Sequence, residues 1–258
     1  MGSCGQRAVA LAAVLSGLAL LVGFAVAGAT GVVASGAFIL GCTLAVFLYS
    51  ERIVLTSLRA RPVSEVEYPA LYRLVRDLAT AARLPVPRLY VAPAPQPNLL
   101  ALGQTPRSVA LCCTEGLLRS LAPDELRAVL AHELGHVTRR DIVASSWSAG
   151  FAALISAAGL RSAAALVLRC TTPSSREYGA DASGALLTGD PMALARALSK
   201  IDFWATSQPL PPHGALAASG HLMIAHPFPD DGYGRLFLTH PPVSERVRRL
   251  EALAGYPH

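Results

Sequence analysis

Two histidines four positions apart, His132 and His136, are the residues of this sequence best suited to chemistry, and Glu133 follows the first of them. If the stretch VLAHELGHVTRRD from Val129 forms a helix, both imidazoles lie on one face and can bind one metal ion. Zinc accepts histidine nitrogen, and a catalytic zinc site uses three protein ligands. Glu133, about 100° around the helix, can take a proton from a water molecule. The pattern predicts a zinc-dependent hydrolase; the alternative is a helix with two hydrogen-bonded core histidines.

A second acidic pair can supply the third ligand. Glu177 and Asp181, in SREYGAD, are again four residues apart. Glu177 can complete the metal site, while Asp181 can accept the second ring N–H of a ligand histidine and so fix its orientation. Alone, this pair is typical of a solvent-facing helix. Together with the first motif, it favours a metal site.

The elements that must position these side chains can be predicted from local sequence. Pro123 is suited to the first turn of the helix that carries both histidines, and Gly135 within it should let another backbone approach closely. Periodicity and turn residues predict four helices and two strands outside the apolar segments. They are helices over 68–83, 123–140, 175–187 and 242–254, and strands over 88–91 and 108–114.

The N-terminal fifth of the chain is strongly apolar. The whole sequence is 52% hydrophobic and 15% charged, against about 25% charged for a soluble domain. Residues 8–29 and 31–50 lack acidic and basic side chains, and each is long enough to cross a bilayer core of about 30 Å. A signal peptide is the alternative for the first stretch, but a second span follows at once. We therefore expect a transmembrane helical hairpin.

Basic residues flank this hairpin on one side only. Arg7 precedes the first span, and Arg52, Arg59 and Arg61 follow the second, whereas the link over 28–31 has none. The positive-inside rule therefore predicts that both ends of the hairpin lie in the cytoplasm. The expected localisation is the cell membrane, multi-pass, with the remaining domain facing the cytoplasm.

The charge distribution excludes one class of partner. The net charge is +5, but no basic stripe is interleaved with aromatic residues, so no nucleic-acid partner is expected. The charge fits either an anionic membrane surface or solvated helix faces, such as that of Arg246, Arg248 and Arg249. The five cysteines form no CxxC pair, so neither a disulfide framework nor a cysteine zinc site is predicted.

A second apolar stretch, about 142–168, separates the two motifs. His136 and Glu177 can share a metal ion only on one side of the membrane, so the stretch must cross it an even number of times. Two crossings need about 40 apolar residues, and this insert offers about 27, interrupted by Arg161. We expect no full crossing, but a helix that packs within the domain or dips shallowly into the bilayer.

Four stretches together resemble the HtpX-like membrane zinc metalloproteases, gluzincins related to the CAAX prenyl endoproteases. They are LAPDELRAVLAHELGHVTRRD from Leu121, SREYGAD from Ser175, THPPVSERVRRLEAL from Thr239 and the weaker PNLLALG from Pro97. The resemblance implies an α+β, mostly helical fold. It comprises a zincin-type metalloprotease domain over 61–258 with a small edge sheet, attached to a transmembrane hairpin over 1–60.

The resemblance also assigns roles to residues. It implies one zinc ion per chain, bound by His132, His136 and Glu177, with Glu133 as general base and Asp181 supporting a ligand. His240, in THPP, would donate a hydrogen bond to the tetrahedral oxyanion. Strand 108–114 would be the edge that receives the substrate backbone. The expected substrate-binding residues are Asn98, Ser108, Val109, Ala110, Leu111 and Cys112.

The function implied is that of a membrane-bound zinc endopeptidase. Its expected partners are the lipid bilayer and polypeptide substrates, either membrane proteins or unfolded proteins in quality control. The alternative is a non-catalytic zinc-binding membrane scaffold. A structural zinc site is closed by four protein ligands, whereas this sequence offers three and a base, which favours catalysis.

Overall fold

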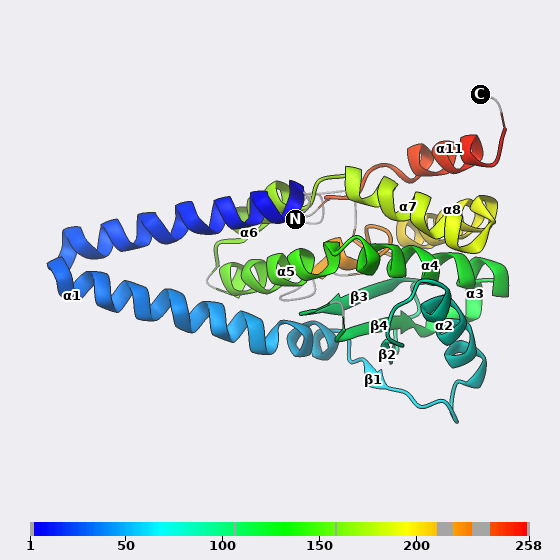
Figure 1. Cartoon of the computed structure of the whole chain (residues 1–258), viewed down its shortest axis with the longest axis horizontal. Helices are drawn as coiled ribbons and strands as arrows, with labels where there is room; N and C mark the ends of the chain where they lie inside the picture. The colour runs from blue at the N-terminus through cyan, green and yellow to red at the C-terminus, as the bar shows by residue number, and fades with distance from the viewer. Residues whose placement is uncertain (1–2, 106, 158, 211–218, 229–237, 257–258) are drawn as a thin grey trace.

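An N-terminal helical hairpin projects from the rest of the molecule in the computed structural model, which describes residues 3–105, 107–157, 159–210, 219–228 and 238–256 (Figure 1). Helix α1 (Ser3–Ser57) reverses direction at Ala27 and Gly28, whose backbones are not helical. Gly28 has φ +59°, a conformation that side chains other than glycine rarely adopt. The reversal falls where the sequence predicts the link between two spans.

The hairpin is apolar and largely exposed. Ala13–Val46, 34 residues across both arms, has a mean hydropathy of 2.1 in its most apolar window, and 6% of that window is buried. Among the described residues it is the one stretch with the length and composition to cross a membrane. A core helix of a soluble protein would be buried, so this exposure sets α1 apart from the helices of the main domain.

The apolar insert forms two helices rather than the single helix expected. Helix α5 (Asp141–Ala157) and helix α6 (Arg161–Thr171) pack against each other and against α1, and α5 lies between the arms of α1 (Figure 1). Gly150 of α5 faces α1 so closely that a side chain there would collide with Val46. The chain turns near Gly159, which has φ +82°, so the interruption expected at Arg161 is the start of a second helix.

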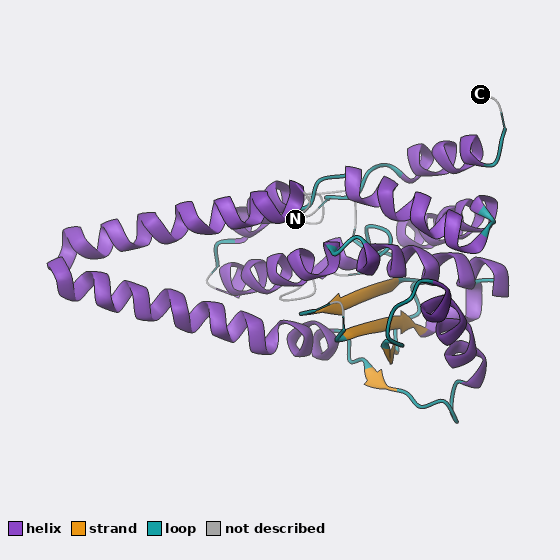
Figure 2. Cartoon of the chain, in the orientation of Figure 1, coloured by secondary structure: helices purple, strands orange, loops and turns teal. Residues whose placement is uncertain are grey.

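A four-stranded mixed sheet lies against the helical layer. Its strands are coloured orange in Figure 2. Its strands are β1 (Arg61–Pro62), β2 (Arg88–Ala92), β3 (Leu99–Gly103) and β4 (Val109–Thr114), in the order β1-β2-β4-β3. Strand β4 is parallel to β2 and antiparallel to β3. The prediction that 108–114 is an edge strand was therefore wrong, because β4 is interior. Strand β3, which had been assigned to the segment before the edge, is one of the two edge strands.

Seven further helical elements lie in the described part of the domain. They are α2 (Pro69–Ala81), α3 (Glu115–Ser120), α4 (Pro123–Thr138), α7 (Ser175–Thr188), α8 (Pro191–Ser207), the 3-10 helix η1 (Gly220–Leu222) and α11 (Val243–Leu253). Four of them, α2, α4, α7 and α11, agree with the predicted helices to within two residues. The fold is mostly helical with a small sheet, as expected.

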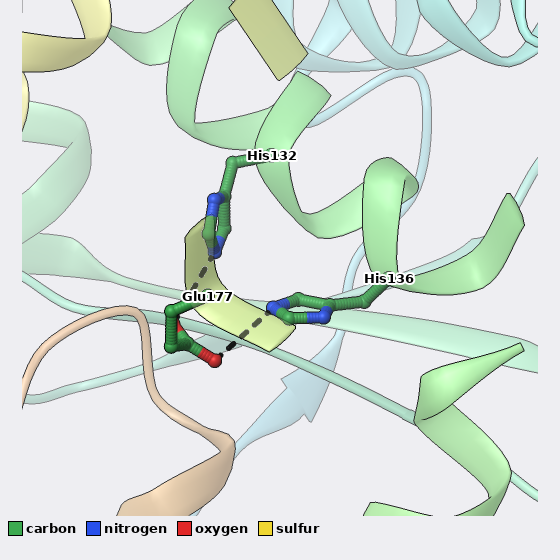
Figure 3. Close-up of side chains that lie close together, drawn as sticks. All are labelled: His132, His136 and Glu177. Atoms are coloured by element: carbon green, nitrogen blue, oxygen red, sulfur yellow. Dashed lines mark ion pairs between the residues drawn. The ribbon is translucent and has the colours of Figure 1, made fainter. Parts of the chain in front are cut away.

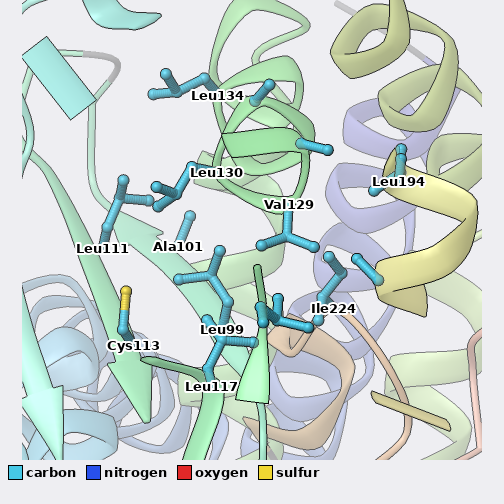
Figure 4. Packing of buried hydrophobic residues seen from close by; sticks show 14 of the residues in the cluster. Leu99, Ala101, Leu111, Cys113, Leu117, Val129, Leu130, Leu134, Leu194 and Ile224 are labelled. Atoms are coloured by element: carbon cyan, nitrogen blue, oxygen red, sulfur yellow. The ribbon is translucent and has the colours of Figure 1, made fainter. Parts of the chain in front are cut away.

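Helix α4 forms the centre of the core. It begins at Pro123, and the carboxylate of Glu125 accepts a hydrogen bond from the Ala122 backbone N–H, which fixes the first turn. Every residue from 128 to 137 is buried. Leucine and valine side chains of α4 pack between the sheet and helix α8 (Figure 4). This packing fixes the rotation of α4, and therefore the direction in which its histidines point.

Candidate metal centre

Three side chains from two helices converge in the interior (Figure 3). His132 and His136 come from α4, and Glu177 comes from the first turn of α7. Their ligand atoms all lie within 4.8 Å of one another. The Nε2 atom of His132 is 3.8 Å from Glu177 Oε2, and that of His136 is 3.5 Å from Glu177 Oε1. Ligands at about 2.0–2.1 Å around a tetrahedral zinc are about 3.4 Å apart, so the three residues are close to binding geometry.

Glycines let the two helices approach this closely. A Cβ atom on Gly184 of α7 would lie 2.8 Å from the His132 backbone nitrogen, and one on Gly135 of α4 would lie 3.1 Å from the Ala180 carbonyl oxygen. Both distances are shorter than ordinary packing allows. The expectation that Gly135 admits a neighbouring backbone is confirmed, and the contact places Glu177 beside the histidines.

The donor set has the chemistry that a metal ion requires. Burial lowers the pKa of His132 although Asp181 opposes the shift, so the imidazole is neutral. Its Nε2 atom has no hydrogen-bond partner among the described residues. Burial opposes ionisation of Glu177, but interactions with His136 and His240 outweigh it, and its pKa lies well below the ordinary value. A neutral imidazole at His132 and an ionised carboxylate at Glu177 fit zinc.

Asp181 supports His132 as the sequence suggested. Its Oδ1 atom lies 2.9 Å from His132 Nδ1, on the side of the ring away from Glu177. Burial raises the pKa of Asp181, but the charge and hydrogen bonds of Arg246 bring it to about 2. Asp181 is therefore a carboxylate that accepts the ring N–H and leaves Nε2 free for a metal ion.

Asp141 stands in the corresponding place beside His136, and the sequence reasoning missed it. Its Oδ2 atom is 3.7 Å from His136 Nδ1, and neither atom has a hydrogen-bond partner among the described residues. Arg139 and Arg176 flank the carboxylate at 3.4 and 3.9 Å. Each histidine thus has an acidic side chain at its second ring nitrogen.

Glu133 lines the same pocket as two of the candidate ligands, His136 and Glu177. The pocket is lined by Glu133, His136, Glu177, His221 and Ala101, among others. Burial, and then the negative charge of Glu177, raise the pKa of Glu133 well above normal, and a hydrogen bond from the Ala101 backbone partly offsets the rise. A carboxyl group of this kind can hold a proton near neutral pH.

His240 also reaches the site. Its Nδ1 atom is 3.4 Å from Glu177 Oε2, and its Nε2 atom is 3.4 Å from the Gly220 carbonyl oxygen. His221, which the sequence reasoning did not assign to the site, lines the pocket, with Nε2 3.2 Å from the Ser145 carbonyl oxygen. The segment around η1 therefore closes one side of the site.

The structure does not support the expected substrate strand. Val109, Ala110, Leu111 and Cys112 lie in β4, whose peptide groups pair with β2 on one side and β3 on the other. The residue Ser108 precedes β4, and its hydroxyl contacts Thr105. A strand paired on both sides has no free edge for a substrate backbone, so this prediction was wrong for β4.

Asn98, the remaining predicted substrate residue, is fully buried and bonded within the chain. Its Nδ2 atom donates to the Ala225 carbonyl oxygen at 3.3 Å, and its Oδ1 atom accepts from the Leu99 N–H at 3.0 Å. It therefore shapes the start of β3. The outer edge of β3 faces the site instead, with Ala101 bonded to Glu133 and the Gly103 N–H bonded to the Ser146 hydroxyl at 3.1 Å.

Arg246 contradicts the expectation of a solvated helix face. Its side chain has 0% exposure, and it donates to both oxygens of Asp181 at 2.9 and 2.7 Å. The signal was present in the sequence, because Arg246 shares a helix face with Val243 and Leu250. Arg248 and Arg249 are exposed, as expected, and pair with Glu245.

The mostly helical fold and the paired histidine and glutamate motifs define a metallopeptidase of the HExxH class. The chain belongs to peptidase family M48, whose family model matches residues 65–254. It is 44% identical over 250 residues to a protein named Protease HtpX homolog from Kineococcus radiotolerans, with 84% of this chain and 85% of the relative covered. A protein of the same name from Arthrobacter sp. is 41% identical over 269 residues, covering 95% of this chain and 93% of that relative.

A solved structure has the same fold. The crystal structure of S. mikatae Ste24p matches 95% of this chain and 65% of its own length, with a TM-score of 0.52 and 18% sequence identity. This likeness concerns the fold alone. Together with the family match, it confirms the resemblance identified from the four motifs.

Proposed function

We propose that this chain is a membrane-bound zinc endopeptidase in which His132, His136 and Glu177 bind one zinc ion. The observation that carries the proposal is the convergence of these three ligand atoms within 4.8 Å, with buried Glu133 at the pocket that His136 and Glu177 line. Membership of a peptidase family supports the reaction. The donor set, two imidazoles and one carboxylate, supports zinc as the ion.

The chain's own residues account for the proton transfers. A bound zinc ion supplies a water molecule of lowered pKa and polarises the scissile carbonyl group. Glu133, whose pKa is raised, takes up the proton released as water attacks and then donates it to the leaving amine. His240 Nδ1 has no hydrogen-bond partner among the described residues and lies beside Glu177, where it can donate to the developing oxyanion.

The substrate backbone is proposed to pair with β3. The outer edge of β3 lies next to the pocket, since Ala101 lines it and bonds to Glu133. An extended peptide can add to such an edge through main-chain hydrogen bonds. This recognition is independent of side-chain identity and suits unfolded segments of membrane or damaged proteins, the substrates proposed here.

The proposed membrane arrangement has the hairpin over 1–60 in the bilayer and the domain over 61–258 facing the cytoplasm. The exposed apolar surface of α1 supports the first part, and the basic flanks support the second. Because α5 begins at Asp141, beside His136, and extends along α1, the proposed active site lies close to the membrane surface.

The alternative, a zinc-binding scaffold without activity, has less support. A structural zinc site is closed by four protein ligands. The group of candidate ligands among the described residues has three members, and Glu133 is buried at a cost that a scaffold does not require.

The test separates metal binding from catalysis. Glu133→Gln keeps the size of the side chain but removes the proton acceptor. Protein purified in detergent should retain parental zinc content, while casein digestion falls by several orders of magnitude. Glu115→Gln, an exposed glutamate on α3, is the matched control and should behave as the parent. Digestion that persists in Glu133→Gln, with contaminating protease excluded, would refute the proposed mechanism.

A further inference from the structure

Arg246 is a fully buried arginine whose side chain contacts two different parts of the site. Its Nε and one terminal nitrogen donate to Asp181, at 2.9 and 2.7 Å. Its other terminal nitrogen donates to the Ile224 carbonyl oxygen at 2.7 Å and lies 3.6 Å from Glu177 Oε2. One guanidinium group therefore touches the supports of the metal centre and the segment that covers the edge strand.

The contacts with Asp181, which we call the metal branch, connect Arg246 to the metal ligand His132. Asp181 Oδ1 is shared between Arg246, at 2.7 Å, and His132 Nδ1, at 2.9 Å. The arginine fork holds the carboxylate plane through two hydrogen bonds, and that plane sets the direction of the imidazole. A lysine has a single nitrogen and cannot fix both oxygens in this way.

The contact with Ile224, which we call the second branch, connects Arg246 to the segment beside the pocket. Ile224 donates its N–H to the Leu99 carbonyl oxygen at 2.9 Å, and Met223 forms an antiparallel bridge with Leu100. This short contact covers the first part of β3 and leaves the part around Ala101 facing the pocket. Arg246 holds the Ile224 carbonyl group in place, so it determines where the covered part of the edge ends.

We propose that Arg246 is a positioning residue that joins these two parts of the site. Through Asp181 it orients His132 for the metal ion, and through Ile224 it anchors the segment that borders the substrate edge of β3. It touches neither the substrate nor the metal ion in this role. The inference rests on the proposed zinc peptidase function and adds to it a device by which helix α11 aligns the metal centre with the substrate edge.

Two variants separate the branches. Arg246→Lys keeps the charge but loses the fork, and it should weaken zinc affinity about 10–100-fold, as changes to groups supporting metal ligands do. It should also speed deuterium exchange in the peptide over 219–228. Asp181→Asn should weaken zinc affinity to a similar extent and leave that exchange unchanged. Arg249→Lys, an exposed position on the same helix, is the matched control and should change neither quantity.

Zinc affinity is measured by competition with a chromogenic chelator, and exchange by mass spectrometry of the zinc-loaded protein. Arg246→Lys protein with zinc affinity within twofold of the parent would overturn the metal branch. Unchanged exchange over 219–228 would overturn the second branch. Neither readout needs proteolysis, so a parent that binds zinc but digests no casein would refute the proposed function and still test Arg246.

A double variant keeps the proposal testable if Arg246→Lys does not fold, because an unpaired buried charge is destabilising. Asp181→Asn with Arg246→Met removes both charges at once. If Arg246 acts on the metal ion through Asp181, the double variant binds zinc no more weakly than Asp181→Asn alone. A further loss of tenfold or more in the double variant would show independent effects and overturn the assignment.

Discussion

His132 Nδ1 and Asp181 Oδ1 lie 2.9 Å apart, on the side of the imidazole opposite Glu177. This contact selects the tautomer in which Nδ1 carries the proton and Nε2 presents its lone pair to the centre. His132 and Asp181 come from different helices, so the tautomer depends on the close crossing of α4 and α7. The ligand geometry of the site is therefore a property of helix packing as well as of the histidine motif.

Glu177→Ala should abolish zinc binding and activity together. The carboxylate is the donor that α7 contributes, and without it two imidazoles remain, one fewer than a catalytic zinc site uses. The measurement is zinc per chain by atomic emission after gel filtration, alongside casein digestion. Glu115→Ala, on an exposed face, is the control. Full zinc content in Glu177→Ala would place the third ligand elsewhere.

His240→Phe should lower kcat about 100-fold, in the range seen when an oxyanion donor is removed. The KM and the zinc content should stay close to those of the parent, because the lost contact belongs to the transition state. Steady-state kinetics on a fluorogenic peptide, with zinc analysis of the same sample, make the comparison. Loss of zinc from this variant would instead make His240 a structural support of Glu177, which it contacts at 3.4 Å.

Local periodicity made the centre of this site predictable, because i, i+4 pairs on one helix face depend on nothing outside the helix. His132 with His136, and Glu177 with Asp181, are such pairs. Asp141 was missed because its position beside His136 depends on a backbone turn and not on helix periodicity. It follows a tight turn in which Arg140 has φ +59°, and only that turn brings the Asp141 carboxylate back towards His136.

The sheet was harder to predict than the helices. Strand β3 carries the run LLALG, in which all five residues are buried. It therefore lacks the alternation of apolar and polar residues that marks a half-exposed strand. Sequence also does not give the order of strands, and the placement of β4 between β2 and β3 depends on contacts far apart in the chain. The edge was assigned to the wrong strand as a result.

Cys112 and Cys113 should resist thiol reagents in the folded protein. Burial raises the pKa of Cys112 to about 12 and raises that of Cys113 as well, and the thiolate is the reactive form. Iodoacetamide at pH 8 should label exposed Cys170 and spare both until the chain unfolds. Peptide mapping measures this, with Cys170→Ser as control. Labelling of Cys112 in folded protein would contradict its burial.

The same pKa shift gives a pH dependence of stability. A cysteine thiol of the unfolded chain has a pKa near 9.0, whereas burial raises the pKa of folded Cys112 to about 12. In that window the unfolded state binds fewer protons, so the free energy of unfolding should fall as pH rises from 9 to 12. Cys112→Ala should flatten this fall, as measured by thermal unfolding at several pH values.

The last prediction concerns the apolar insert, which we expect not to cross the membrane. Helix α5 has 17 residues and α6 has 11, or about 25 and 16 Å at 1.5 Å per residue. Both are shorter than the bilayer core of about 30 Å. They also lie at the base of the α1 hairpin rather than along its full length (Figure 1).

Cysteine scanning with an impermeant maleimide, in intact cells and a cysteine-free background, tests this arrangement. Arg161→Cys, at the start of α6, should not be labelled from outside. Thr30→Cys, in the link of the hairpin, should be labelled from outside, and Ser64→Cys, after the hairpin, should be labelled only after lysis. These two positions are the controls for both sides. Labelling of Arg161→Cys in intact cells would show that α5 and α6 form a second crossing pair despite their length, with His136 and Glu177 still on the same side.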